Sequence, residues 1–560
     1  MTKLRKTKLS LLLGLVGCAT TVYATDNDIN VLINADIITM NPDKPSAQAI
    51  AYADGKILAI GSTQHVQSIA GKDANIVDLK GKTVIPGLIE THDHIFLSSA
   101  TAVITDVAPF TTPKLSDALV KIGETKVNEE GWVIAFGADQ TLYEEKRGPH
   151  ITELDALFPN DPVAIFHLSG HGAYVNSKAL ELAGIDESTA DPQGGFFEKD
   201  ENGKLTGFLS GQPAIFMVTN YPAADAYTTT VAAKQRAAAG ITTASDFSVM
   251  NEPILELLSD VTAQEGFSTR IVGGLFSTAP NFDELARSVP DYENELFKVP
   301  FVKTWTDGSI QGGTGNLTQG YYDEAFGESG AQGTQEYYNQ QMLDIYALGM
   351  WPAFHTNGDG ATDMALNAIE FAQNETKNTD IRPQLIHVQY TRPEQITRMS
   401  ELNTQPTFFT THIYYWGDLH YESTLGAERA QRLSAMKDAV DAGLKPAMHN
   451  DKPVSDIDPF LNIELAVTRT SSSGRVLGAD QAITPYQALE AYTTHAAYQF
   501  GMEDVAGSLE VGKYADFVVI DANPLSVEPT SIRNIQVQGT VMNGNVTYSG
   551  LDELDTLNSQ

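Results

Sequence analysis

The chain has little cysteine and few basic residues, and its apolar N-terminal run is too short to cross a membrane. Its one cysteine, Cys18, rules out a disulfide within the chain. There are 36 Lys and Arg against 71 Asp and Glu, so the formal net charge at pH 7 is −35. Such acidity argues against nucleic acid as a partner and against electrostatic binding to an anionic membrane, because both need a basic surface.

The N-terminus departs from this acidity. Four of the first eight residues are basic, and an apolar run over residues 9–16 and then small residues follow. This layout is typical of a secretory signal, with a buried first helix as the alternative. Cleavage after Ala24 and cleavage before Cys18, where "LVGC" resembles the bacterial lipobox, both stay open. We therefore expect residues 1–24 to be a signal peptide and the protein to be exported, to the bacterial periplasm or as an outer-membrane lipoprotein anchored through Cys18.

The two ends of the mature chain share a pattern of short strands punctuated by glycine. Residues 28–86 alternate between apolar and polar, with hairpins predicted at Asp54-Gly55 and around Lys80-Gly81. Residues 506–550 have the same pattern and a predicted turn at Asn543-Gly544. We therefore expect both ends to build one small β domain.

Residues 87–505 alternate apolar strands with helical segments that carry Ala and Leu on one face. A helix that ends near Gly or Pro and leads into a strand is the rhythm of a parallel sheet or barrel. Residues from about 105 to 225 break this rhythm, with a turn predicted at residues 200–203, and are expected to form a mixed α/β insertion.

The stretch "VIPGLIETHDHIF" ends a buried-looking strand with His92 and His94. Residues i and i+2 of a strand point to the same face, so both imidazoles can reach one metal ion while Asp93 points away. An isolated H-x-H pair is weak evidence, because many histidines are only hydrogen-bonded core residues.

Four more strand-like segments finish on a residue that can bind metal. They are "FVKTWTDGS" with Lys303, "MWPAFHTNGDGA" with His355, "PQLIHVQY" with His387, and "LKPAMHNDKPVSDIDP" with Asp451. In a parallel barrel the carboxyl ends of all strands meet at one mouth. Imidazoles, a lysine and a carboxylate gathered there suit one or two ions such as zinc.

With these residues in view, the chain resembles the metal-dependent amidohydrolase superfamily, in the branch of N-substituted formamide deformylase-like enzymes. The resemblance covers nearly the whole mature chain through motifs in the family's order, among them "VIPGLIETHDH", "SGHGAYVNSKAL", "VKTWTDGSIQGGTG", "FHTNGDGATDMAL", "THIYYWGDLH", "HNDKPVSDIDP" and "GSLEVGKYADFVVID". It implies an α/β fold, a (β/α)8 TIM-like barrel with a small β-sandwich built from both chain ends.

The resemblance also implies a role for each ligand-type residue. His92 and His94 would bind a first metal, His355 and His387 a second, and Lys303, carboxylated by carbon dioxide, would bridge the two. Asp451 would contact the first metal and act as acid and base. A mononuclear site without a carboxylated lysine stays open.

Two departures from the family pattern are visible next to these ligands. Ile386 precedes His387 where relatives commonly have Glu, and Asn450 precedes Asp451 where Ser is usual. Neither removes a ligand.

Further residues are candidates for the surroundings of the metal. His171, His412 and Tyr415 are candidates for the substrate pocket, with ordinary hydrogen-bonded structure or packing as the alternative. Asp307 is expected to shape the turn after Lys303, and Asp359 to support His355.

The expected activity is hydrolysis of C–N bonds other than peptide bonds in a small-molecule amide, cyclic amide or N-acyl compound. A metal-bound water has a pKa of about 7 instead of about 16 and supplies hydroxide, while a carboxylate moves the proton to the leaving nitrogen. Ester or carbamate hydrolysis would use the same residues, and a periplasmic solute-binding protein is the alternative from another class. An oligomer is compatible with the family.

Overall fold

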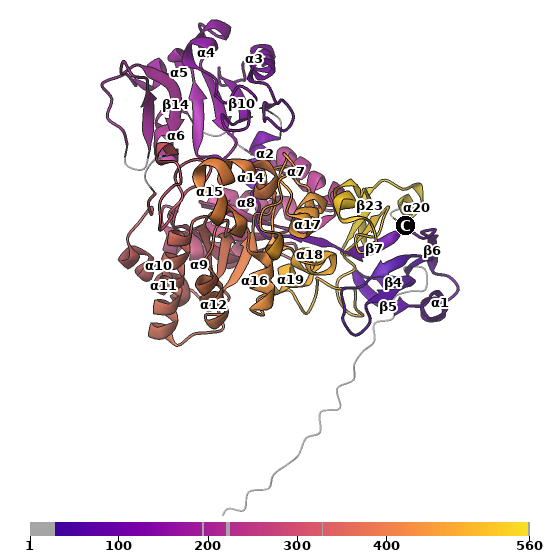
Figure 1. Cartoon of the computed structure of the whole chain (residues 1–560). Helices are drawn as coiled ribbons and strands as arrows, with labels where there is room; N and C mark the ends of the chain where they lie inside the picture. Colours follow the sequence, from indigo (N-terminus) through magenta and orange to yellow (C-terminus); the bar gives the residue numbers. More distant parts are fainter. Residues whose placement is uncertain (1–28, 103, 193–194, 220–223, 327–328, 558–560) are drawn as a thin grey trace, which may run out of the picture.

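The computed structural model describes residues 29–102, 104–192, 195–219, 224–326 and 329–557. These form a central barrel, a β-sandwich on one side of it and an α/β insertion at another (Figure 1). The expected signal peptide lies outside the described residues. Among the residues described, no helix combines the length and the apolar character needed to cross a bilayer.

The sandwich consists of two sheets that use strands from both ends of the chain. The first has the order β5 (Lys56–Gly61), β4 (Ala49–Ala53), β1 (Asn30–Ile33) and β6 (Asn75–Asp78), beside helix α1 (Thr63–Ala70). The second has the order β24 (Asn545–Ser549), β23 (Val537–Met542), β22 (Phe517–Ile520), β7 (Thr83–Pro86), β2 (Asp36–Ile38) and β3 (Ser46–Ala47). The C-terminal β22 pairs with the N-terminal β7, so in Figure 1 the yellow C-terminal strands and the indigo N-terminal strands lie in one sheet.

Turn residues explain two of the hairpins. Asp54 and Gly55 both have positive φ, 50° and 71°, and connect the antiparallel strands β4 and β5. Asn543 and Gly544, with φ of 51° and 78°, do the same between β23 and β24. Two successive positive φ values match the twist of a two-residue hairpin, and Asn-Gly and Asp-Gly adopt them readily.

The hairpin predicted around Lys80-Gly81 is wrong. The turn exists, with φ of 52° and 86°, but β6 pairs with β1 and β7 pairs with β2 and β22. The turn therefore carries the chain from one sheet of the sandwich to the other. Which sheet each strand joins is determined by its pairing with strands that are distant in the sequence.

The barrel is an eight-stranded sheet, and its hydrogen-bonded neighbouring strands are all parallel. Its strands are β8 (Leu88–Glu90), β15 (Ile241–Val249), β16 (Arg270–Phe276), β17 (Phe297–Trp305), β18 (Trp351–Thr356), β19 (Gln384–His387), β20 (Gln405–Phe408) and β21 (Ala447–Met448). The first and last strands approach each other, since Thr91 Oγ1 donates to the Met448 carbonyl at 3.0 Å.

Helices between successive strands, and three helices after the last strand, cover the outside of the barrel (Figure 1). They are α7 (Ala226–Ala238), α8 (Glu252–Thr262), α9 (Phe282–Tyr292), α10 (Gln335–Ala347), α11 (Asp359–Thr376), α12 (Pro393–Glu401), α16 (Met436–Asp441), α17 (Pro459–Thr468), α18 (Pro485–Tyr492) and α19 (Thr494–Gln499). A short helix α2 (Ile95–Thr101) follows β8, and α13 (Thr411–Tyr415), α14 (Gly417–Leu419) and α15 (Gly426–Arg429) follow β20.

The insertion separates the first two strands of the barrel. Its sheet has the order β13 (Phe196–Lys199), β14 (Leu205–Ser210), β12 (Gly172–Val175), β11 (Val163–His167), β10 (Val133–Ala138) and β9 (Thr105–Asp106). Four helices accompany it: α3 (Leu115–Glu124), α4 (Ile151–Leu157), α5 (Ser177–Ala183) and α6 (Gln212–Val218). The predicted fold class is confirmed: a TIM-like barrel, a small β-sandwich from both chain ends and an α/β insertion.

Candidate metal centre

The residues predicted to bind metal lie at the carboxyl-terminal mouth of the barrel. In strand order they are His92 and His94 just after β8, Lys303 in β17, His355 in β18, His387 at the end of β19 and Asp451 just after β21. All except His94 have at most 5% of their surface exposed, and the His94 side chain is 17% exposed. The side chains therefore meet in a site largely closed to bulk water.

The carboxylate of Asp451 is the centre of the first group. Its Oδ1 lies 3.3 Å from Nε2 of His92 and 3.3 Å from Nε2 of His94. Its Oδ2 lies 3.7 Å from Nδ1 of His387. Ligand atoms of His92, His387 and Asp451 all lie within 4.8 Å of one another, close enough to bind one ion.

Lys303 and His355 complete the arrangement. Lys303 Nζ lies 3.4 Å from Nε2 of His92, and the ring centre of His355 lies 4.5 Å from that of His387. Burial lowers the pKa of Lys303 to about 7, so near neutral pH much of this lysine is the uncharged amine. The uncharged amine is the form that can react with carbon dioxide.

The protonation of the other groups also suits a cation. Burial lowers the pKa of His92 and His387 well below the usual histidine value, which keeps both imidazoles neutral and able to bind metal. Burial alone would raise the pKa of Asp451, but the neighbouring His94 and Lys303 hold it below its ordinary value. Asp451 is therefore a carboxylate.

The polar atoms at the centre fit a divalent ion. Asp451 Oδ1 and His387 Nδ1 are buried and make no hydrogen bond within the protein. An unpaired buried polar atom costs about 1–3 kcal/mol, so convergent unpaired atoms favour a bound partner. Imidazole nitrogens with a carboxylate oxygen are ligands that zinc prefers. The residues present therefore fit the metal that the sequence predicts.

A buried ion pair fixes the two histidines after β8. Asp93 points away from the metal side, and its carboxylate accepts two hydrogen bonds from Arg236 of α7, both at 2.8 Å. Ser245 Oγ accepts the backbone N–H of Asp93, and Arg236 also donates to Ser98. His92 and His94 are thereby held in position by a helix on the outside of the barrel.

His355 is oriented by Asp307, not by Asp359. Nδ1 of His355 lies 3.1 Å from Asp307 Oδ1, and the same carboxylate accepts the backbone N–H groups of Asn357 and Gly358. Asp359 instead accepts hydrogen bonds from Arg392 and from the Thr318 backbone, so its expected support of His355 is wrong. A carboxylate behind a ligating imidazole fixes its ring and tautomer.

Asn450 anchors the segment that carries Asp451. Its backbone N–H and side-chain amide donate to the two carboxylate oxygens of buried Glu90, at 2.9 and 2.6 Å. The amide also donates to the Tyr492 hydroxyl. Asp451 and His387 both have positive φ, 59° and 75°, a backbone conformation that costs energy and is concentrated at functional sites.

The three expected pocket residues lie in different places. His171, from the insertion loop between β11 and β12, has its ring centre 6.4 Å from that of His355, so it faces the centre. His412 is 1% exposed and bonds to Gln389 at 2.9 Å, next to the strand end that carries His387. Tyr415 packs against Phe110 of the insertion, with ring centres 4.1 Å apart.

One imidazole at the centre was missed from the sequence. His449 is fully buried, with its ring centre 5.1 Å from that of His92 and 5.0 Å from that of His387. The signal was present, since His449 precedes Asp451 by two residues at a strand end, which is the same spacing that singled out His92 and His94.

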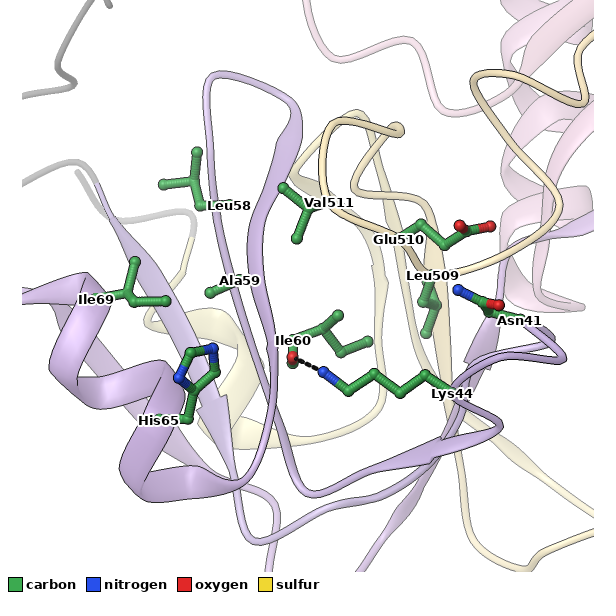
Figure 2. Close-up of a pocket in the computed structure, with 10 residues that line it drawn as sticks. All are labelled: Asn41, Lys44, Leu58, Ala59, Ile60, His65, Ile69, Leu509, Glu510 and Val511. Carbon is green, nitrogen blue, oxygen red and sulfur yellow. Dashed lines mark hydrogen bonds between the residues drawn. The ribbon is translucent and has the colours of Figure 1, made fainter.

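A cavity of about 370 Å³ lies in the β-sandwich, away from these ligands (Figure 2). Its titratable lining residues are Lys44, His65 of α1 and Glu510, and Lys44 Nζ donates to the carbonyl oxygen of Ile60 at 2.5 Å. One imidazole and one carboxylate do not make a converging ligand set, so the chemistry belongs to the barrel mouth.

A parallel barrel whose mouth gathers buried imidazoles, a lysine and a carboxylate defines a metal-dependent hydrolase. The sequence model of the amidohydrolase family matches residues 75–548, and the chain belongs to that family. The predicted resemblance and the prediction of a metal-dependent amidohydrolase are therefore confirmed.

Similar proteins agree with this assignment. The N-substituted formamide deformylase of Arthrobacter pascens is 27% identical, over 92% of this chain and 98% of that protein. The Bacillus subtilis strain 168 protein YtcJ, named as an amidohydrolase, is 26% identical over 91% of this chain and 98% of its own. An uncharacterized metal-dependent hydrolase from Pyrococcus horikoshii OT3 shares the fold, with a TM-score of 0.72, 23% identity and coverage of 90% and 99% of the two chains.

Proposed function

We propose that this protein is an exported enzyme that cleaves C–N bonds other than peptide bonds in a small amide, cyclic amide or N-acyl compound. The observation that carries the proposal is the carboxylate of Asp451, which lies 3.3 Å from two imidazole nitrogens in a buried site. The name of the relative from Arthrobacter pascens, an N-substituted formamide deformylase, supports an N-acyl amine as the substrate.

The chain offers ligands for two zinc ions. His92, His94 and Asp451 would hold one ion, and His355 with His387 the other. Lys303, after its amine reacts with carbon dioxide, would contribute a carboxylate oxygen to each. Such ions, when bound, lower the pKa of a bound water and polarise a substrate carbonyl.

Asp451 would move the proton. As a carboxylate beside the attacking water it accepts the proton while the oxygen bonds to the carbonyl carbon. It then gives that proton to the nitrogen as the C–N bond breaks, so that an acid and an amine leave. His171 lies next to His355 and, as a neutral imidazole, would hydrogen-bond the substrate, since burial lowers its pKa to about 4.

The test combines metal analysis with turnover. We expect the purified mature protein to hold about two zinc ions, to hold fewer in Lys303→Ala, and to lose hydrolysis of N-acyl amines and cyclic amides in Asp451→Asn. Asp438→Asn is the matched control, because Asp438 lies on the outer helix α16 and its carboxylate pairs with Arg432. It should keep both metal and activity.

Other results would indicate a different metal centre, a different substrate or a different class of protein. One ion, with activity that survives Lys303→Ala, would mean a mononuclear centre. A preference for esters or carbamates would leave the proposed roles of the site residues unchanged and would change only the substrate class. Absence of stoichiometric metal and of turnover would contradict the enzyme and favour a solute-binding protein.

The export proposal has its own measurement. Mass spectrometry of the mature N-terminus separates a chain cut after Ala24 from one that begins with a lipidated Cys18. A retained Met1 would contradict export by a cleaved signal.

A further inference from the structure

Asn357 has a buried amide oxygen that the proposed reaction does not use. The residue lies just after β18, two residues beyond His355, and 2% of its surface is exposed. Its Oδ1 is buried and has no hydrogen-bond partner within the protein. Asn462 of α17 differs, because its Oδ1 accepts a hydrogen bond from Thr410 and its Nδ2 donates to the carbonyl oxygen of His449. A buried acceptor without a donor is costly unless another group binds there.

The contacts of Asn357 determine which end of its amide is the oxygen. Nδ2 donates to the carbonyl oxygen of Gly308 at 2.7 Å, so the nitrogen has to face that carbonyl. The backbone N–H of Asn357 donates to Asp307, which holds the residue from its other side. The free end of the amide is therefore the oxygen, which accepts hydrogen bonds and donates none.

This amide lies beside the nitrogen of His355 that faces the metal centre. Nδ1 of His355 bonds to Asp307 at 3.1 Å, which leaves Nε2 as the nitrogen turned toward the centre. Nδ2 of Asn357 lies 3.4 Å from that Nε2, and Oδ1 is bonded to the same carbon as Nδ2. A substrate that lies against His355 is therefore within reach of the Asn357 oxygen.

We propose that Asn357 is a specificity-determining residue whose Oδ1 accepts a hydrogen bond from the N–H of the C–N bond that is cleaved. The inference rests on the proposed function and narrows its substrate class to amides that carry a hydrogen on that nitrogen. An ester has an oxygen in this position and an N,N-disubstituted amide has a carbon substituent, so neither can donate. A site built around a hydrogen bond rejects an analogue that lacks the donor, because the buried acceptor is then left unpaired.

The experiment uses three probes that differ only at the bond that is cleaved: N-butylformamide, N-butyl-N-methylformamide and butyl formate. Turnover is measured as kcat/KM, and binding by calorimetry in an Asp451→Asn background, which should leave the probes intact. We expect the preference of the parent for N-butylformamide over its N-methyl derivative to fall at least about tenfold in Asn357→Leu, in both measurements. A purely structural role would lower the values for all three probes alike and leave their ratios unchanged.

The matched control is Asn367→Leu, an exposed asparagine on α11, which should keep the parent's ratios. Unchanged ratios in Asn357→Leu would overturn the inference and leave the proposed function standing. Loss of bound zinc in Asn357→Leu would also overturn it, since the oxygen would then belong to a metal ion.

The parent protein separates the inference from the proposed function. A parent that neither binds nor cleaves the three probes would contradict both, and a parent that cleaves only butyl formate would overturn the inference together with the amide substrate. If circular dichroism shows that Asn357→Leu does not fold, Asn357→Ser, which is smaller and polar, is measured in its place with the same expectation.

Discussion

At the scale of single residues, burial determines which form of each histidine this protein uses. His420 is fully buried, with Nε2 3.3 Å from Nδ1 of His412 and Nδ1 2.7 Å from the Thr424 hydroxyl. Burial lowers the pKa of His420 to about 3. A proton on this ring would be a charge without a carboxylate partner, so the folded state keeps it neutral.

This predicts a loss of stability in acid. The folded-state pKa of His420, about 3, is below its unfolded value, so its stabilising contribution is complete above pH 6.5 and lost as pH falls toward 3. The loss is on the order of several kcal/mol. Urea unfolding of metal-free protein at a series of pH values should show a flatter acid slope in His420→Gln than in the parent. The exposed His65→Gln serves as control, and parallel slopes for parent and His420→Gln would contradict the prediction.

At the scale of elements, loops at the barrel mouth are held by partners on neighbouring helices and strands. Arg236, from α7, is fully buried and has Asp93 as its carboxylate partner. Removing one member of a buried pair leaves an uncompensated charge, which costs about 3–5 kcal/mol, whereas an exposed pair contributes about 0–1 kcal/mol.

We therefore expect Arg236→Met to lower the free energy of unfolding by about 3–5 kcal/mol and to weaken zinc binding, because His92 and His94 flank Asp93. Arg398→Met removes a partly exposed arginine paired with Glu370 at 2.8 Å and is the matched control. Denaturant unfolding of metal-free protein measures the first effect and chelator competition the second. Equal effects of the two substitutions would show that the buried pair does not position the histidines.

The sequence predicted the elements where a local pattern was sufficient. Apolar strands ending on Lys303, His355 or His387 could be read directly, as could the Asp54-Gly55 turn. The features that the sequence did not predict depend on residues that are distant in the sequence and close in the fold. Which carboxylate orients His355, Asp307 instead of the expected Asp359, depends on which one the fold places behind that ring. The Lys80-Gly81 turn likewise could not reveal that the strands on its two sides enter different sheets.

At the scale of the whole molecule, the two chain ends close the β-sandwich against the barrel. Strand β22, from the C-terminal part, pairs with β7 on one side and β23 on the other. Its Val518 shares a hydrophobic core with Ile241 of the barrel and Ala232 of α7. The barrel and the sandwich thus bury a common apolar surface, which favours unfolding as one unit.

A buried ion pair crosses the same boundary and tests this cooperativity. Arg270 of β16 donates to Asp516 at 2.8 Å, and each side chain is 6% exposed. Asp516→Asn leaves the arginine without its countercharge, so we expect a loss of about 3–5 kcal/mol, seen in calorimetry as one transition at lower temperature. The pair lies away from the barrel mouth, so zinc binding by the folded variant should match the parent. If the variant instead unfolds in two separate steps, the sandwich and the barrel are independent, and the C-terminal strands serve the sandwich alone.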